Sequence, residues 1–509
     1  MALNADFLQN IKEKDMLYVS TRGSLNKKTG AQAVIRGIAE DRGLYVPATI
    51  PKLPFKVEDM LDASYKEIAK KILLCYFDDF TEEEMDYCVN GAYDSKFTAS
   101  DVCELREADG IHFLELYHGK TAAFKDMALS ILPYLLTTSM KKEGVTDKVL
   151  ILTATSGDTG KAALEGFSDV PGTEIIVFYP DGGVSQVQRQ QMITTTGSNT
   201  HVYAVKGNFD DCQTEVKKIF NDPEINAALK ERGIIFSSAN SINIGRLVPQ
   251  VAYYVYSYVK MVARGAVKNG EPINIVVPTG NFGNILAGYM AMKMGIPVNK
   301  FICASNDNKV LTDFIRTGLY DIRPETRDFM LTNSPSMDIL ISSNLERLLY
   351  LLNGRDADQV SEWMYSLEAL GFYTVMDSES FVEGMKVFWG GHCVEADTLK
   401  TIGDMWKEHG YLMDTHTGVA CKVYKDYVKE TGDETPAVLA STASAFKFAE
   451  AVGEALGLPK ASDGFRAVED LEKATGVSVP YGLKDLDKKE VMHTGVVTID
   501  EMPETVLGI

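Results

Sequence analysis

The sequence predicts an α/β protein in which parallel sheets are covered by helices and a mainly helical domain comes first. Between residues 148 and 317, short apolar runs rich in β-branched residues alternate with segments of helical periodicity. This alternation is typical of βαβ units, which build parallel sheets with helices on both faces. The 509 residues, 45% apolar and 24% charged, have the composition of an ordinary globular protein and suffice for a large core.

The elements follow in order along the chain. Residues 1–95 are expected to form the helical domain, because 57–77 and 81–93 show helical spacing and the second stretch opens with acidic residues. Buried strands are expected at 149–152, 175–179, 202–205, 234–236, 275–277, 301–304 and 437–442. Helices are expected at about 160–168, 184–196, 210–220, 244–264, 282–294 and 309–317. We expect residues 96–460 to form two α/β subdomains with a helical insertion at about 355–410, and 461–509 to be a tail packed on them.

Charge and cysteine usage narrow the class of protein. With 51 basic and 71 acidic residues the net charge is −20, which disfavours nucleic acid and anionic membranes as partners. The seven cysteines are scattered and never form Cys-x-x-Cys, so we expect reduced thiols, and no histidine or cysteine cluster has metal-ligand spacing. The N-terminus lacks a signal-peptide pattern, and no apolar run approaches the roughly 20 residues that span a bilayer. We therefore expect a cytoplasmic protein without a metal.

A lysine at the start of a predicted helix is the leading catalytic candidate. Residues 118–130 read HGKTAAFKDMALS, and Lys125 stands where a polar turn gives way to the helix. Its apolar neighbours 122–124 would desolvate the ammonium and lower its pKa, as an imine-forming lysine requires. On this segment alone, a helix-start lysine held by Asp126 is the commoner arrangement, because most lysines are surface charges.

Three strand-to-helix loops have the composition of anion sites. Residues 153–161 (TATSGDTGK) lack the glycine and hydroxyl positions of a nucleotide P-loop, so free amides and hydroxyls at a helix start remain, which suit a carboxylate. Residues 278–284 (PTGNFGN) place two glycines around Asn-Phe and suit a phosphate dianion, without dinucleotide spacing. Residues 237–246 (SSANSINIGR) offer three hydroxyls, two amides and a guanidinium to a second phosphate. For each loop, a capped turn without a ligand is the alternative.

These motifs resemble, in order and over nearly the whole chain, those of threonine synthase, a pyridoxal-phosphate enzyme of fold type II (tryptophan synthase β-like). The lysine segment is similar to the family's His-Gly-Pro-Thr-x-Ala-Phe-Lys-Asp, with Lys120 replacing proline. The segment 441–448 (STASAFKF) is similar to Ser-Thr-Ala-His-Pro-Ala-Lys-Phe, with Ser444 and Ala445 replacing His-Pro. Residues 334–348 and the N-terminal STRG and GLYVP strings are also similar to family segments. In that N-terminal part, Arg22 is expected to form a surface salt bridge.

The resemblance implies a role for each motif. It makes Lys125 the catalytic residue that carries the cofactor and moves protons, Asp158 the group facing the cofactor's ring oxygen, and Thr442 the hydroxyl at its pyridine nitrogen. The implied cofactor-binding residues are Lys125, Asp158, Gly280, Asn281, Phe282, Gly283, Asn284 and Thr442. The implied substrate-binding residues are Thr155, Ser156 and Thr159 for the carboxylate, and Asn240, Ser241, Asn243 and Arg246 for the phosphate.

The implied activity is the conversion of O-phospho-L-homoserine and water to L-threonine and phosphate by a carbon–oxygen lyase, the last step of threonine biosynthesis. Pyridoxal 5'-phosphate would be the cofactor, and the assembly a monomer or weak homodimer. One alternative is a threonine-synthase-like phospholyase acting on a related phosphorylated amino alcohol, which the intact carboxylate and phosphate loops disfavour. Another is a non-catalytic binding protein of the same fold, which the presence of Lys125 disfavours.

Overall fold

The computed structural model describes residues 16–155 and 157–509. Residues 1–15, on which the expectation of no signal peptide depends, and Ser156, a predicted carboxylate-binding residue, lie outside the described residues. Within the described ranges, none of the helices combines the length and apolarity needed to cross a membrane.

The N-terminal region contains the two helices expected there. Both begin with a capping box, in which Ser64 or Thr81 accepts the N–H of a glutamate three residues later and receives that glutamate's side chain in return. A small antiparallel pair of strands precedes them, and the helix that begins at Tyr65 packs on the long helix α10. The elements are β1 (Tyr18–Ser20), α1 (Gly30–Arg36), β2 (Tyr45–Pro47), α2 (Tyr65–Tyr76), α3 (Glu82–Ala92) and α10 (Ile244–Ala263).

The larger sheet has six strands in the order β13-β10-β9-β14-β4-β3. The pairs from β13 to β4 are parallel, and β3 and β4 form an antiparallel hairpin that the sequence analysis did not anticipate. The strands are β3 (Glu104–Ala108), β4 (Ile111–Glu115), β9 (Ile273–Pro278), β10 (Val298–Ser305), β13 (Phe388–His392) and β14 (Ala437–Ser441).

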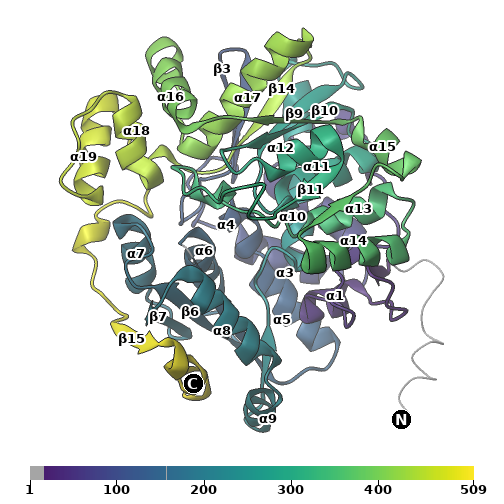
Figure 1. The fold of residues 1–509 in the computed structure, drawn as a ribbon, viewed down its shortest axis with the longest axis vertical. Helices are drawn as coiled ribbons and strands as arrows, with labels where there is room; N and C mark the ends of the chain where they lie inside the picture. Colours follow the sequence, from purple (N-terminus) through teal and green to yellow (C-terminus); the bar gives the residue numbers. More distant parts are fainter. Residues whose placement is uncertain (1–15, 156) are drawn as a thin grey trace.

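The smaller sheet is wholly parallel and has the order β15-β7-β6-β5-β8. It lies in the lower part of Figure 1 with the larger sheet above it, and α4 (Lys125–Leu129) lies between them. The strands are β5 (Lys148–Ala154), β6 (Thr173–Pro180), β7 (Thr200–Lys206), β8 (Ile234–Ser237) and β15 (Gly495–Thr498). The predicted class, parallel sheets covered by helices, is confirmed.

The helices expected between the strands are all present. Helix α10 is buried along nearly its whole length and packs against α2, α4 and α11. This packing supports α4, the helix that begins with Lys125. The helices are α5 (Leu132–Lys142), α6 (Asp158–Phe167), α7 (Gln186–Ile193), α8 (Phe209–Asn221), α9 (Pro223–Glu231), α11 (Gly283–Met294), α12 (Val310–Thr317), α13 (Leu345–Leu352), α17 (Thr415–Thr431), α18 (Ala449–Ala455), α19 (Gly464–Thr475) and α20 (Met502–Leu507).

The segment 355–410, expected to be a helical insertion, is only partly helical. It contains α14 (Ala357–Leu370), α15 (Glu379–Met385) and α16 (Glu395–His409), but also β12 (Phe372–Thr374) and β13. Strand β13 pairs with β10 and is part of the larger sheet. Two of its five residues are glycines, so its sequence lacks the apolar, β-branched pattern typical of a buried strand. The glycines allow close packing, because a Cβ on Gly390 would come within 3.1 Å of the Thr312 backbone. The C-terminal tail likewise supplies β15 to the smaller sheet.

Candidate active site

The end of β14 positions Lys125. The backbone N–H of Phe124 donates to the carbonyl of Thr442 at 2.7 Å, and the N–H of Ser444 donates to the carbonyl of Ala122 at 3.0 Å. These bonds hold the residues before α4 against the residues after β14. Lys125, the first residue of α4, is thereby placed beside Thr442, so the structure brings these two predicted residues together.

The Lys125 ammonium is desolvated and has two polar partners. Its Nζ donates to Oγ of Ser336 at 3.2 Å and lies 3.7 Å from Oδ2 of Asp158. Burial is the main cause that lowers the pKa of Lys125; Lys447 and Arg246 lower it further, while Asp158 opposes them. The lowered pKa agrees with the expectation from the apolar neighbours.

Asp126 does not hold this lysine. Its carboxylate accepts the N–H and the hydroxyl of Thr121 at 2.8 and 2.6 Å and so shapes the turn before α4. Burial raises the pKa of Asp126 to about 6. The alternative of a helix-start lysine held by Asp126 is therefore not what the structure shows.

Asp158 is the anionic centre of the site, and Lys447 is its strongest partner. Lys447 Nζ lies 2.7 Å from Oδ1 of Asp158, and Gln188 Nε2 donates to the same oxygen at 3.0 Å. Burial opposes ionisation of Asp158, but the ammoniums of Lys447 and Lys125 outweigh it and hold the pKa of Asp158 well below its usual value. The sequence analysis missed Lys447, although the family pattern similar to 441–448 has a lysine at this position.

The loop before α6 is ordered by its own threonine. Thr155 Oγ1 accepts the N–H of Gly157 at 3.0 Å and of Gly160 at 2.9 Å. Gly157 has φ 139°, a conformation that favours glycine. Thr159 is half-buried in the first turn of α6. Because both internal bonds use lone pairs of Thr155, its hydroxyl proton remains available to a carboxylate.

The loop 280–284 is a tight turn that touches Ser336. Asn281 presents its carbonyl to the N–H and the side-chain amide of Asn344, both at 3.1 Å, and Phe282 has φ 63°. A Cβ on Gly280 would lie 2.4 Å from the carbonyl oxygen of Ser336. The loop is therefore next to the residue that Lys125 contacts.

The same loop leads into α11 with an unsatisfied donor. Asn284 Nδ2 is buried and finds no hydrogen-bond partner in the described part of the chain, while Oδ1 of the same residue accepts from the hydroxyl of Tyr254. Gly283 is less crowded than Gly280, because the nearest atom to an added Cβ is 3.4 Å away. A buried amide without a partner at a helix start is suited to an anionic ligand.

The loop 237–246 contains a helix-capping residue, Asn243, and a buried cation, Arg246. Asn243 caps α10 by accepting the N–H of Gly245 at 2.9 Å, and it donates to the carbonyls of Val34 at 3.0 Å and Ser238 at 3.2 Å. Its side chain is thus fully used, whereas Asn240 is exposed and Ser241 half-buried. For Asn243 the structure favours the capping alternative.

Arg246 is buried, and its guanidinium is only partly satisfied. Nη1 donates to the carbonyl of Ala239 at 2.8 Å, but among the described residues Nε has no hydrogen-bond partner and no carboxylate forms an ion pair with the guanidinium. Burial lowers the pKa of Arg246 to about 10. A buried cation without a counter-ion, close enough to influence Lys125, fits an anionic ligand.

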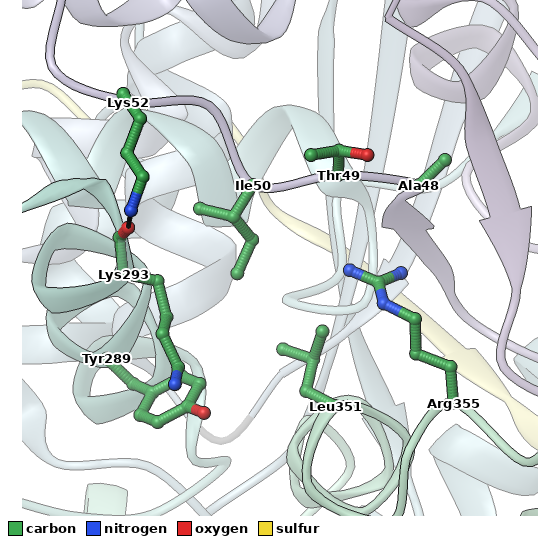
Figure 2. Close-up of a pocket in the computed structure, with 8 residues that line it drawn as sticks. All are labelled: Ala48, Thr49, Ile50, Lys52, Tyr289, Lys293, Leu351 and Arg355. Carbon is green, nitrogen blue, oxygen red and sulfur yellow. Dashed lines mark hydrogen bonds between the residues drawn. The ribbon is translucent and has the colours of Figure 1, made fainter.

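Arg22 and a surface hollow lie apart from the residues around Lys125. Arg22 forms a partly exposed bidentate pair with Glu346, at 3.0 and 2.8 Å, as expected for a salt-bridge residue. A surface hollow of about 370 Å³ contains none of the predicted site residues, and its only drawn hydrogen bond joins Lys52 Nζ to the carbonyl of Lys293 at 3.2 Å (Figure 2). Its lining residues are Ala48, Thr49, Ile50, Lys52, Tyr289, Lys293, Leu351 and Arg355.

Comparisons with known proteins agree with this geometry. Residues 17–93 match the model for the threonine synthase N terminus, 103–364 that for pyridoxal-phosphate dependent enzymes, and 417–491 that for the threonine synthase C-terminal region. Human threonine synthase-like 1 is 40% identical over 86% of this chain, and the chain spans 59% of the human protein's length. Threonine synthase from Schizosaccharomyces pombe is 35% identical over 86% of this chain and 89% of its own. The crystal structure of pyridoxal-phosphate-bound threonine synthase from Brucella melitensis superposes with a TM-score of 0.85 at 34% identity, covering 97% of this chain and 99% of that one.

Proposed function

This chain belongs to the threonine synthase family of pyridoxal-phosphate dependent enzymes, and on that premise we propose that it converts O-phospho-L-homoserine and water to L-threonine and phosphate. The observation that carries the proposal is that two groups of buried donors, each with an atom that has no hydrogen-bond partner among the described residues, lie near one desolvated lysine. One is the loop 280–284, and the other is the buried guanidinium of Arg246. A phosphorylated cofactor and a phosphorylated substrate require two such sites.

The residues around Lys125 fit pyridoxal phosphate. The cofactor's phosphate would lie on the loop 280–284, where the unpartnered Nδ2 of Asn284 and the start of α11 offer donors. Asp158, held ionised by Lys447, would face the ring oxygen, and Thr442 would offer its hydroxyl to the pyridine nitrogen. When bound, the cofactor supplies an electron sink for the carbanions of the reaction.

The chain's own groups would then bind the substrate and move its protons. The substrate carboxylate would lie at the start of α6 beside Thr155, Ser156 and Thr159, and its phosphate at Arg246 with Asn240 and Ser241. Lys125, with its lowered pKa, would exchange protons at Cα and Cβ of the substrate. Burial lowers the pKa of the lysine and so favours the uncharged amine, the form that accepts a proton.

The test is an assay of phosphate release from O-phospho-L-homoserine paired with detection of threonine. Equal amounts of both products support the proposal. Phosphate without threonine would point to the second candidate, a phospholyase acting on a related phosphorylated amino alcohol. No phosphate release by the cofactor-loaded protein would reject both.

We also propose that the enzyme works in a reducing compartment such as the cytoplasm. All seven cysteines lie among the described residues and all are unpaired, six of them buried. Buried thiols without disulfides are usual where thiols are kept reduced.

A further inference from the structure

We propose that Ser336, His416 and Asp414 form a positioning chain that holds the nitrogen of Lys125 in place whenever it is not joined to the cofactor. This inference rests on the proposed role of Lys125 as the cofactor-carrying residue. It assigns a part in catalysis to three residues that the motifs around Lys125 do not include.

The contacts run from half-buried Lys125 and Ser336 to the buried pair His416 and Asp414. Ser336 accepts a hydrogen bond from Lys125 Nζ at its Oγ (3.2 Å), and its backbone N–H donates to Nε2 of His416 at 3.1 Å. His416 Nδ1 lies 2.6 Å from Oδ2 of Asp414, which also accepts the His416 backbone N–H at 3.0 Å. His416 is 3% exposed and Asp414 is fully buried.

This pattern defines the protonation state of His416. Because Nε2 accepts the N–H of Ser336, the ring proton must be on Nδ1, where it is donated to Asp414. A second proton on Nε2 would turn the acceptor into a donor that faces another donor. The contact with Ser336 therefore requires an acceptor at the position of Nε2.

The charged groups around His416 come from several elements. Asp414 caps α17, the helix that contains His416, and its carboxylate contacts Nδ1 of the ring. Asp338, in the loop after Met337, interacts with the ring through its charge. Lys125 and Asp158 lie beyond Ser336, whose hydroxyl is 3.5 Å from Asp158 Oδ2. The ring of Phe448 packs edge-on against the imidazole, with centroids 4.9 Å apart.

The segment that carries Ser336 is held independently of its hydroxyl. Asn306 Nδ2 donates to Ser334 Oγ at 3.0 Å and to Asp338 Oδ1 at 2.8 Å, and the N–H of Thr332 donates to Asp338 Oδ2 at 2.9 Å. A Ser336→Ala change should therefore remove the contact with Lys125 and leave the segment in place.

The experiment uses the full chain and follows the attachment of pyridoxal phosphate to the apoenzyme by the visible absorbance of the cofactor. His416→Gln places an amide oxygen near the position of Nε2, whereas His416→Phe removes the acceptor. We expect Ser336→Ala and His416→Phe to slow attachment about three-fold to ten-fold at neutral pH, the worth of one hydrogen bond. His416→Gln should retain most of the rate, because it keeps an acceptor for the Ser336 N–H, whereas His416→Phe should not.

His493→Gln is the matched control, because His493 is a partly buried histidine that contacts the Thr195 carbonyl at 3.0 Å, outside this chain of contacts. It should leave the rate unchanged. Wild-type attachment rates in His416→Phe and Ser336→Ala would overturn the inference, as would a His416→Gln variant indistinguishable from His416→Phe. Since attachment needs no substrate, a failure here is distinct from a failure to form threonine, which would overturn the proposed function.

Discussion

The ammonium of Lys447 lies 2.7 Å from Oδ1 of Asp158, and no part of the Lys447 side chain is exposed. A second bond, to the carbonyl of Thr121 at 3.0 Å, holds the same nitrogen. Lys447 therefore neutralises Asp158, so that Lys125 does not have to remain protonated as its only counter-ion. This arrangement separates a lysine that balances charge, Lys447, from Lys125, the lysine that we propose reacts.

Replacing Lys447 with methionine should disturb both partners. Loss of its charge raises the pKa of Lys125 and removes the main cation beside Asp158, so attachment of pyridoxal phosphate should require higher pH than in the wild type. Breaking a buried ion pair should also lower the unfolding free energy by about 3–5 kcal/mol. Absorbance titration of the cofactor and denaturant unfolding measure the two effects, with the exposed Lys473→Met as control. An unshifted attachment profile would show that Lys447 is not electrostatically coupled to Lys125.

Borohydride reduction of the cofactor-loaded enzyme, followed by peptide mapping, should place the pyridoxyl group on Lys125. Lys447 is the competitor that the structure adds, because it is buried in the same site, but its nitrogen is occupied by Asp158 and Thr121. Lys161 is paired with Glu165 and Thr195 and is not available. An adduct on Lys447 would exchange the roles of the two lysines.

The two glycines of the loop 280–284 should respond differently to alanine. Gly280→Ala puts a Cβ 2.4 Å from the Ser336 carbonyl, so it should displace that segment and cost about 1–3 kcal/mol of stability. Gly283→Ala has room in the protein and should fold normally, yet weaken cofactor binding if the phosphate approaches this backbone. Thermal unfolding and equilibrium dialysis with pyridoxal phosphate separate the two outcomes. Unchanged cofactor affinity in Gly283→Ala would mean that this residue does not line the phosphate site.

How much of the fold the sequence predicts depends on how each strand is buried. Strands β5 to β10 are apolar runs because parallel strands are covered on both faces, and all six were predicted. The β3–β4 hairpin was missed, although Asp109-Gly110, with φ 52° and 69°, is a favoured two-residue turn and was a usable signal. Strand β13 had no comparable signal, because two of its five residues are glycines.

The candidate site was predictable where chemistry lies in a local motif. Lys125 and the loop 280–284 could be found because a turn, a glycine pair or an apolar neighbour marks them in the sequence. Ser336 and His416 could not, because their importance depends on contacts across 211 and 80 residues of chain. Asn243 shows the opposite error, since a polar residue in a plausible loop turned out to be engaged in helix capping.

Asp126 should make stability fall as pH rises from about 4 to about 6. Its pKa in the folded protein is about 6, against 3.8 ordinarily, so in this range the folded chain binds a proton that the unfolded chain has released. The unfolding free energy should therefore decrease with rising pH, by roughly 3 kcal/mol in total from this group. Denaturant unfolding across this range should show a smaller decrease for Asp126→Asn than for the wild type. The exposed Asp328→Asn is the control, and equal pH dependence in wild type and Asp126→Asn would contradict the assignment.

Arg246 is the residue that should distinguish a phosphorylated substrate from an ordinary amino acid. The chain carries a net charge of −20, so a substrate phosphate needs a local cation, and Arg246 is buried with an unpartnered Nε and no carboxylate pair among the described residues. A charge-assisted hydrogen bond contributes about 1.5–3 kcal/mol. Arg246→Ala should therefore raise the KM for O-phospho-L-homoserine about ten-fold to a hundred-fold.

A second variant and a suitable choice of pH make the result specific to the substrate phosphate. Arg246→Lys keeps the charge but loses the planar fork, so it should rescue only part of the affinity. Because the charge of Arg246 also lowers the pKa of Lys125, cofactor attachment in Arg246→Ala should need slightly higher pH, and KM should be compared at a pH where all variants are fully loaded. Since we propose that the cofactor phosphate lies on the loop 280–284 and not at Arg246, the equilibrium affinity for the cofactor should be unaffected at that pH. If Arg246→Ala instead loses the cofactor and keeps its affinity for the substrate, the two phosphate sites are assigned the wrong way round.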